Sequence, residues 1–382
     1  MSKPHQVFPL LITIRILILV VLLRLIAPPP PRALLEAPRT VETQQPHVCV
    51  HTRLMEEVDE WKIQHTLQLV REMGAPTIVE FFPWAYIEPS KDEYHWEATD
   101  RIVRHAHNQG IRIIARMGLV PGWARPNDGE RQTTLNELPP ASYDDFAEFV
   151  AAFAARYADT IHHVIIWNEP NLSFEWGFRP VDAAEYVQML GIVYAATKAA
   201  APDVQVLAAP LAPTLEPPGS AAGLDDLLYL EAMYAAGVAD VSDGIAMHTY
   251  GFNRAPDEIP AANRLNYRRA ELHRTIMERF GDDSPVYITE TGWNDHPRWT
   301  KAVTPARRIA YTLEALAFAE TRWAWAEVVC LWVMRFPAPT GSYPDDFTLV
   351  TPEFQPKPIY YAVQSYARGW SQGDALWLPP PT

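Results

Sequence analysis

Short apolar runs recur along the chain from His47 onward and alternate with stretches of helical periodicity. The runs with the length and composition of buried strands are residues 48–52, 77–82, 111–117, 162–168, 204–209, 243–248, 286–290 and 327–333. The amphipathic stretches between them include residues 55–73, 143–157, 183–200, 263–280 and 305–321. Eight β/α repeats predict an α/β fold with a single parallel (β/α)8 TIM barrel, because parallel strands are joined by helical crossovers.

Two glutamates lie at the ends of these apolar runs. Glu169 follows residues 164–166 within a Trp-Asn-Glu-Pro motif, and Glu290 ends the seventh run and precedes Thr-Gly-Trp. A glutamate after a strand is more often a helix cap or a solvated loop residue, but the two settings match. Strands four and seven face each other across the barrel mouth, where catalytic groups collect. Paired carboxylates at that place favour cleavage of a glycosidic bond, with one as general acid and the other as nucleophile or base.

The first part of the chain lacks the β/α pattern. Residues 7–27 are apolar except for Arg15 and Arg24, and the four prolines that follow make a poor signal cleavage site. The domains we predict are a signal peptide or, preferably, a membrane anchor at 1–27, a Pro-rich linker at 28–45, the barrel at 46–372 and a C-terminal tail at 373–382. This organisation predicts an extracytoplasmic protein that is membrane-anchored or secreted.

Composition narrows the function classes. The formal net charge of −14 argues against a nucleic-acid partner, which requires a basic surface. The 13 tryptophans and 16 tyrosines exceed what packing alone usually requires and suit stacking on sugars, although most of them are expected to be core or interface residues. Cys49 and Cys330 are too few for a disulfide framework. Barrel closure would bring them close together, although two free core thiols are the favoured interpretation.

Further motifs accompany the glutamates. They are Trp167-Asn168-Glu169-Pro170-Asn171-Leu172, Thr289-Glu290-Thr291-Gly292-Trp293, Ile87-Glu88-Pro89, Tyr94-His95-Trp96 with Asp100, Pro121-Gly122-Trp123, and Pro356 through Ala362. With these motifs, nearly all of residues 47–370 resemble the retaining clan A glycoside hydrolases, which are (β/α)8 barrels. Family 39, which is β-xylosidase-like, and family 5, which is cellulase-like, are the nearest.

The resemblance implies roles for individual residues. Glu169 matches the acid/base and Glu290 the nucleophile of the clan. The substrate-binding residues it implies are Asn168 for the 2-hydroxyl, His248 for the sugar, Tyr250 for the nucleophile, Trp332 as the sugar platform, and Trp123 in a neighbouring subsite. A structural role for His248, as a core histidine hydrogen-bonded within the protein, remains an alternative. The expected substrate is an oligo- or polysaccharide, and no cofactor or metal is expected.

One departure from the clan pattern concerns the second and third strands. The clan often has an arginine or histidine near their ends, and the nearest groups here are Glu80 and Arg116. Arg116 could serve the nucleophile, but a structural ion pair between the two residues is the favoured interpretation.

Other functions fit the sequence less well. A metal-dependent hydrolase would use His47 and His51, but four residues of strand span roughly 13 Å, which is too far to share one ion. His162 and His163 precede their strand and so lie at the opposite end of the barrel. A non-catalytic carbohydrate-binding barrel and a transglycosylase remain alternatives, and the sequence does not decide the sugar or the linkage.

Overall fold

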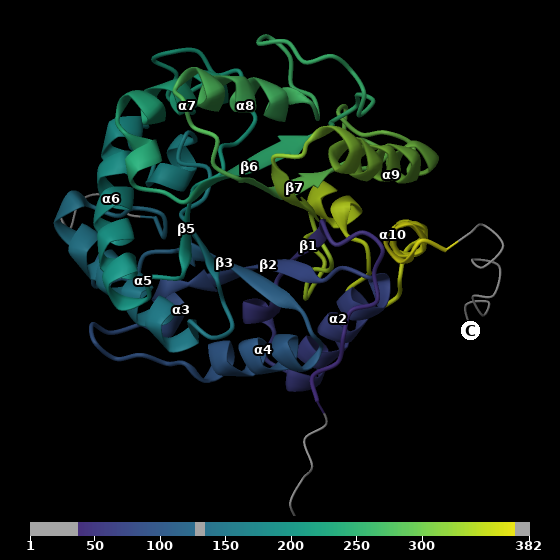
Figure 1. Ribbon diagram of the computed structural model, residues 1–382, viewed down its shortest axis with the longest axis horizontal. Helices are drawn as coiled ribbons and strands as arrows, with labels where there is room; N and C mark the ends of the chain where they lie inside the picture. The colour runs from purple at the N-terminus through teal and green to yellow at the C-terminus, as the bar shows by residue number, and fades with distance from the viewer. Residues whose placement is uncertain (1–36, 127–133, 371–382) are drawn as a thin grey trace, which may run out of the picture. The chain divides into compact units, whose positions relative to one another are not determined.

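The computed structural model describes residues 37–126 and 134–370 of the chain. Eight parallel strands follow one another in chain order and close into a barrel, so the predicted single TIM barrel is confirmed (Figure 1). The strands are β1 (Val48–Thr52), β2 (Thr77–Pro83), β3 (Arg112–Gly118), β4 (His163–Ile166), β5 (Gln205–Ala208), β6 (Gly244–Tyr250), β7 (Val286–Gly292) and β8 (Ala326–Leu331). Each predicted run corresponds to one of them, with boundaries shifted by a few residues.

Helices surround the barrel (Figure 1). They are α2 (Glu60–Met73), α3 (Trp84–Ile87), α4 (Glu97–Asn108), α5 (Tyr143–Tyr157), α6 (Ala183–Ala200), α7 (Asp226–Ala235), α8 (Arg269–Arg279), α9 (Pro305–Arg322) and α10 (Pro358–Arg368). The predicted stretches 143–157 and 183–200 coincide with α5 and α6. The stretch 55–73 begins later as an α-helix, because a 3-10 turn at Leu54–Glu56 and an extended segment precede α2.

Strand alternation divides the core into two layers. The side chains that point into the barrel form one buried apolar cluster: Cys49, Val79, Ile114, Ile165, Leu207, Ala246, Tyr287, Val328 and Cys330. The alternate strand residues belong to the larger cluster that packs between the sheet and the helices. The inner cluster is therefore a closed floor, and side chains two residues further along each strand rise above it toward the mouth.

A disulfide bond joins Cys49 to Cys330 within this floor. The favoured expectation of two free thiols is therefore wrong. Barrel closure pairs β1 with β8 in a register that sets these two residues directly opposite each other. The two cysteines are 281 residues apart in sequence, so the bond cross-links the first and last strands where the barrel closes.

Residues 37–45 of the predicted linker are described, and Arg39 and Gln44 contact the barrel domain. The Arg39 amide donates to the Asn108 carbonyl, and the Gln44 amide donates to the Ala367 carbonyl. The predicted N-terminal anchor at 1–27 and the whole predicted C-terminal tail at 373–382 lie outside the described residues. Across residues 37–126 and 134–370, no helix combines the length and apolarity needed to cross a membrane.

Candidate active site

The side chains just above the apolar floor are polar, and they come from opposite sides of the barrel. His51 lies two residues after Cys49 on β1, Arg116 two after Ile114 on β3, and His248 two after Ala246 on β6. All three are almost completely buried. On these strands, the inward-facing side chain is apolar at one position and polar two residues later. This change creates a polar site at the carboxyl end of the barrel.

Glu169 and Glu290 meet at this site. Glu169 follows β4 and Glu290 lies on β7. One carboxylate oxygen of each, together with a ring nitrogen of His248, lie within 4.8 Å of one another. The predicted convergence of strands four and seven on one point therefore agrees with the structure. Carboxyl groups about 5–5.5 Å apart are typical of retaining glycosidases, whereas inverting enzymes need roughly 6.5–9.5 Å to admit a water molecule.

Glu290 has several partners that favour its ionised form. The Tyr250 hydroxyl donates to its Oε2 at 2.7 Å, and Arg116 Nη1 donates to its Oε1 at 3.1 Å. Burial is the largest influence and raises the pKa of Glu290, while His248, Arg116 and the Tyr250 hydrogen bond act in the opposite direction. The expected contact of Tyr250 with Glu290 is present.

Glu169 has fewer such partners. Burial raises its pKa to about 7, with only a smaller opposing influence from Arg116. Its Oε1 lies 2.8 Å from Nδ1 of His248, whose Nε2 lies 3.6 Å from Oε1 of Glu290. Burial lowers the pKa of His248 to about 4, so this imidazole is neutral near pH 7. If protonated Glu169 donates to Nδ1, the remaining His248 proton on Nε2 faces the Glu290 carboxylate at 3.6 Å, which is beyond hydrogen-bond distance.

Arg116 does not pair with Glu80, so that expectation is wrong. Phe81 is the register partner of Arg116, so Glu80 points to the opposite face of the sheet. Glu80 instead accepts from the Thr52 hydroxyl at 2.5 Å and from the Leu54 and Met55 amides. Arg116 is left free to reach the mouth, where it donates to Glu290 and to Oδ1 of Asn168.

An aromatic cavity of about 290 Å³ opens beside the two catalytic candidates. Its lining includes Glu169, Glu290 and Tyr250, and the expected sugar platform Trp332. The sequence reasoning missed the other rings that line it: Phe252, Trp299, Tyr343 and Phe347. They lie in the loops after β6, β7 and β8, and only their residue type signalled a role.

His51 was also missed as a site residue. Its Nε2 lies 3.8 Å from Glu290, and its ring contacts Trp332 edge-on.

Trp123, expected in a neighbouring subsite, mainly packs, and so do three other tryptophans that follow barrel strands. Trp84, Trp176 and Trp293 are almost completely buried. Trp123 is half-buried, contacts Trp84 and donates its indole N–H to the Glu88 carbonyl at 3.0 Å. It does not line either of the two described cavities that border the site.

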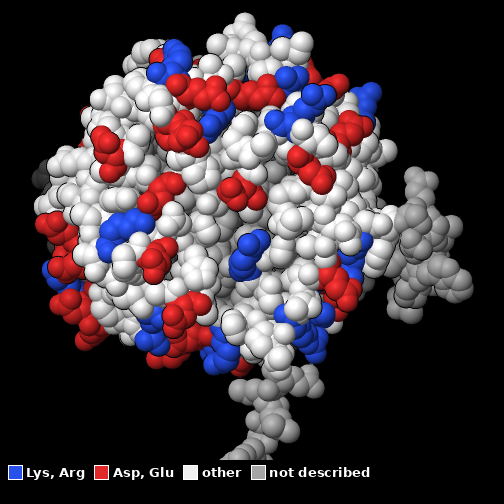
Figure 2. All heavy atoms as spheres, viewed as in Figure 1, with Lys and Arg blue, Asp and Glu red and all other residues white. Residues whose placement is uncertain are grey.

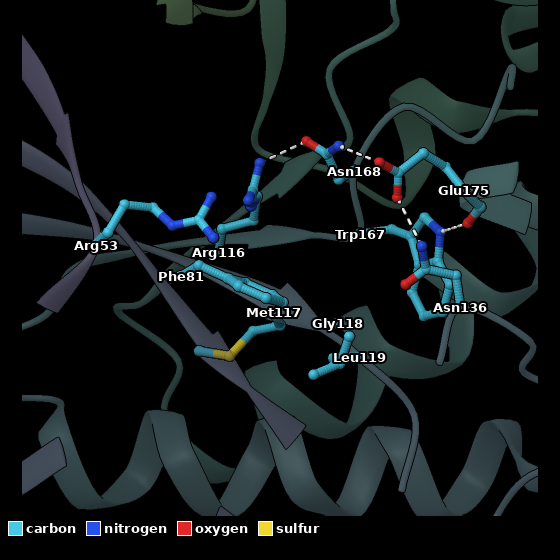
Figure 3. Close-up of a pocket in the computed structure, with 10 residues that line it drawn as sticks. All are labelled: Arg53, Phe81, Arg116, Met117, Gly118, Leu119, Asn136, Trp167, Asn168 and Glu175. Atoms are coloured by element: carbon cyan, nitrogen blue, oxygen red, sulfur yellow. Dashed lines mark hydrogen bonds between the residues drawn. The ribbon is translucent and has the colours of Figure 1, made fainter. Parts of the chain in front are cut away.

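A second, polar cavity of about 180 Å³ lies on the Asn168 side of the site. Figure 3 shows the guanidinium groups of Arg53 and Arg116 on one side and the side chains of Asn168, Glu175 and Asn136 on the other. Phe81 packs beneath the Arg116 guanidinium, whose carbon lies 4.8 Å from the ring centroid. This cavity brings Glu175 and Asn136 into the site, and neither was expected from the sequence.

The loop that presents Glu169 has unusual backbone geometry. Trp167 and Glu169 have positive φ values of 80° and 43°. Such conformations are costly for residues other than glycine and persist where surrounding contacts fix them. Here the Trp167 indole donates to the Glu175 carbonyl at 2.8 Å, and the Glu169 amide donates to the Pro210 carbonyl at 2.9 Å.

The cluster of Glu169, His248 and Glu290 has the spacing of a metal site, which the sequence reasoning did not foresee. However, Arg116 lies 3.1 Å from Glu290 and already compensates its charge. A cation held by these groups would lie beside a guanidinium, which is unfavourable. Metal independence therefore stays a prediction.

The surface charge is mixed: Figure 2 shows acidic and basic groups interspersed over the displayed face.

Comparisons with known proteins point to glycoside hydrolases. Residues 54–126 match the model of glycoside hydrolase family 42, described as beta-galactosidase. No curated protein matches the chain in sequence. A family 39 glycoside hydrolase from the gut symbiont Bacteroides cellulosilyticus WH2 is similar in structure, with a TM-score of 0.67 and 20% identity over 87% of this chain and 65% of that one. The chain has the barrel fold of the clan A glycoside hydrolases.

Two further solved structures widen the range of similar enzymes. A family 5 (GH5_18) protein from Streptomyces cattleya, in complex with GlcNAc, has a TM-score of 0.63 and 18% identity over 89% of this chain and 83% of that one. A beta-galactosidase from the psychrophilic Marinomonas ef1 has a TM-score of 0.57 and 14% identity over 87% of this chain and 61% of that one. The chain thus spans less than two thirds of the family 39 and Marinomonas proteins. The predicted resemblance to clan A glycoside hydrolases is confirmed at the level of the fold, and families 39 and 5 are both among the similar structures.

Proposed function

We propose that this protein is a retaining glycoside hydrolase in which Glu290 is the nucleophile and Glu169 the acid/base. The observation that carries the proposal is the pair of carboxylate oxygens within 4.8 Å at the ends of β4 and β7. The partners of each residue support the assignment of roles. Glu290 accepts from Tyr250 and Arg116 and is suited to remain ionised, whereas burial raises the pKa of Glu169 to about 7 and keeps part of it protonated at neutral pH.

In the first step, a carboxylate oxygen of Glu290 attacks the anomeric carbon, and the bond from that carbon to the leaving oxygen breaks. The electron pair goes to the leaving oxygen, which takes the proton of Glu169. In the second step, Glu169 removes a proton from water as the water oxygen attacks the anomeric carbon and Glu290 departs. Two inversions at one carbon give net retention.

The sugar is not fixed by these groups. Similarity to a beta-galactosidase model over residues 54–126 and to family 39 and family 5 structures supports β-linked sugars as first substrates. The aromatic cavity, with Trp299, Trp332 and Tyr343 on its walls, suits a second sugar or another flat group stacked beside the cleaved bond. An oligo- or polysaccharide is therefore the proposed natural substrate.

A panel of aryl glycosides tests the activity. β-Galactoside, β-xyloside, β-glucoside, β-mannoside and α-L-arabinofuranoside substrates would be compared, and the anomer first released would be read by NMR. At least one substrate should be turned over with retained configuration. An inverted first product from the wild-type protein would exclude the double displacement, and no turnover of the panel or of polysaccharides would favour a carbohydrate-binding barrel.

We also propose that the barrel works outside the cytoplasm, attached through residues 1–27 or secreted. The disulfide between Cys49 and Cys330 supports an oxidising compartment, because such bonds are rare in reducing ones. Fractionation of the full-length protein tests this. Recovery with the cytosol, with an intact N-terminus and reduced cysteines, would contradict it.

A further inference from the structure

The amide of Asn168 is held from both sides. Its Oδ1 accepts from Arg116 Nη1 at 2.6 Å, and its Nδ2 donates to Glu175 Oε1 at 3.3 Å. The same Arg116 nitrogen donates to Glu290. A continuous chain of hydrogen bonds therefore runs from Glu290 through Arg116 and Asn168 to Glu175. Figure 3 shows the part of it from Arg116 to Glu175.

Glu175 is suited to this place only as a carboxylate. Its Oε1 accepts from Asn168, and its Oε2 accepts from Asn136 Nδ2 at 2.9 Å. Two amide donors thus converge on one side chain, and an ionised carboxylate offers an acceptor to each. A protonated carboxyl or a glutamine would turn a donor toward one of these two amides, so one of the hydrogen bonds would be lost.

We propose that Glu175 is a positioning residue that, together with Arg116, fixes the orientation of the Asn168 amide for the sugar 2-hydroxyl. This inference rests on the proposed glycosidase function. With Oδ1 occupied by Arg116 and one N–H by Glu175, the second N–H of Asn168 remains for the substrate. A flipped amide would set its NH2 against the guanidinium and its oxygen against the carboxylate, so the two charged neighbours specify one orientation.

The burial of Glu175 makes its hydrogen bonds to Asn168 and Asn136 sensitive to pH. Burial, the largest influence, and the nearby Glu169 charge raise the pKa of Glu175 to about 7, against the opposing effects of Arg116 and the Asn168 hydrogen bond. Arg53 lines the same cavity from the other side. The hydrogen bonds from Asn168 and Asn136 to ionised Glu175 should therefore be formed above pH 7, and they should weaken as pH falls through that value.

A 2-deoxy substrate isolates this effect. kcat/KM would be measured for one aryl glycoside and its 2-deoxy analogue with wild type, Glu175→Gln, Asn168→Ala and the double variant. Because every enzyme sees the same two substrates, their intrinsic reactivity difference cancels from the comparison. We expect the preference for the 2-hydroxyl substrate to fall about tenfold in Glu175→Gln, the loss of one hydrogen bond to a charged group. The double variant should lose no more than Asn168→Ala does.

Glu185→Gln is the matched control. Glu185 lies on α6, in the same connection between β4 and β5, and accepts from Tyr143 and Arg179 rather than from Asn168. It should keep the wild-type preference even if its stability falls. The preference of the wild type should also decline below pH 7, and that decline should be absent in Glu175→Gln.

The possible results separate the two proposals. An active wild type and an unchanged 2-hydroxyl preference in soluble Glu175→Gln would overturn the positioning role and leave the glycosidase proposal standing. A preference that falls equally in Glu185→Gln would assign the effect to loop stability and also overturn the role. No turnover by the wild type would overturn the glycosidase function and, with it, this inference.

Discussion

Glu169 and Glu290 are the same side chain in nearly the same place, yet their surroundings differ. Glu290 accepts from Tyr250 at 2.7 Å and from Arg116 at 3.1 Å, whereas the described hydrogen-bond partner of the Glu169 carboxyl is His248 at 2.8 Å. Both are buried enough for their pKa values to rise. The comparison teaches that neighbours, rather than position on the barrel, distinguish a nucleophile from an acid.

The largest expected effect follows from removing the better-stabilised carboxylate. Glu290→Ala should reduce turnover of every substrate by roughly 10⁴- to 10⁶-fold, because no covalent intermediate forms. Azide should restore part of the activity by entering the vacated side and should give a product of inverted configuration. Kinetics and NMR of the azide product measure both outcomes. Near-normal turnover without azide would remove Glu290 from the mechanism.

Glu169→Ala should have a smaller effect that depends on the leaving group. Unactivated glycosides should lose about 10²- to 10⁴-fold, the usual contribution of a general acid. Aryl glycosides with good leaving groups should still form the intermediate, and azide should then give a product of retained configuration. If the two variants exchanged these phenotypes, the assignment of nucleophile and acid would be reversed.

Tyr250→Phe tests the difference between the two surroundings directly. Loss of its hydroxyl removes one hydrogen bond to ionised Glu290, so kcat/KM should fall about 10- to 100-fold. Tyr360→Phe is the control, because the Tyr360 hydroxyl donates to the Leu69 carbonyl at 2.8 Å and removing it also costs one buried hydrogen bond. Its kinetics should stay normal. Equal kinetic losses in both variants would mean that general stability accounts for the effect.

The sequence predicted the fold and the convergence of Glu169 and Glu290 because both depend on local pattern. Each strand is a short apolar run, and Glu169 and Glu290 lie beside such runs. The Glu80 and Arg116 pairing was wrong because it depends on the register between β2 and β3, which fixes the face that each side chain occupies. Single-strand periodicity does not contain that information.

Residues supplied by loops were the least predictable. Glu175 lies in a 3-10 turn, and its contact with Asn168 depends on the left-handed backbone of Trp167 and Glu169. Asn136, Trp299 and Tyr343 also lie in connections without a periodic pattern. The Cys49–Cys330 bond could be predicted only in part from the sequence. Barrel closure brings β1 beside β8, but the direct opposition of the two cysteines depends on the register between these strands.

The smallest expected effect is the position of the basic limb of the pH profile. Glu169 must be protonated for the first step, and burial raises its pKa to about 7, so kcat/KM for unactivated glycosides should fall as pH rises through about 7. The acid limb should follow protonation of Glu290.

The raised pKa of Glu169 also affects stability, because the folded state holds the Glu169 proton more tightly than the unfolded state does. Glu169 therefore contributes stability below its unfolded pKa near 4.5, and this contribution is lost as pH rises toward 7.

Glu169→Ala separates this limb from other titrations. With an aryl glycoside for which the wild type shows the basic limb, the variant should lose this limb of the first step. Its melting temperature should also fall less between pH 5 and pH 8 than that of the wild type. The expected difference follows from the carboxyl that the variant lacks, while Glu290 keeps its Tyr250 and Arg116 partners in both proteins. A basic limb near pH 7 that persisted unchanged in Glu169→Ala would assign it to another group and would weaken the contrast between the two glutamates.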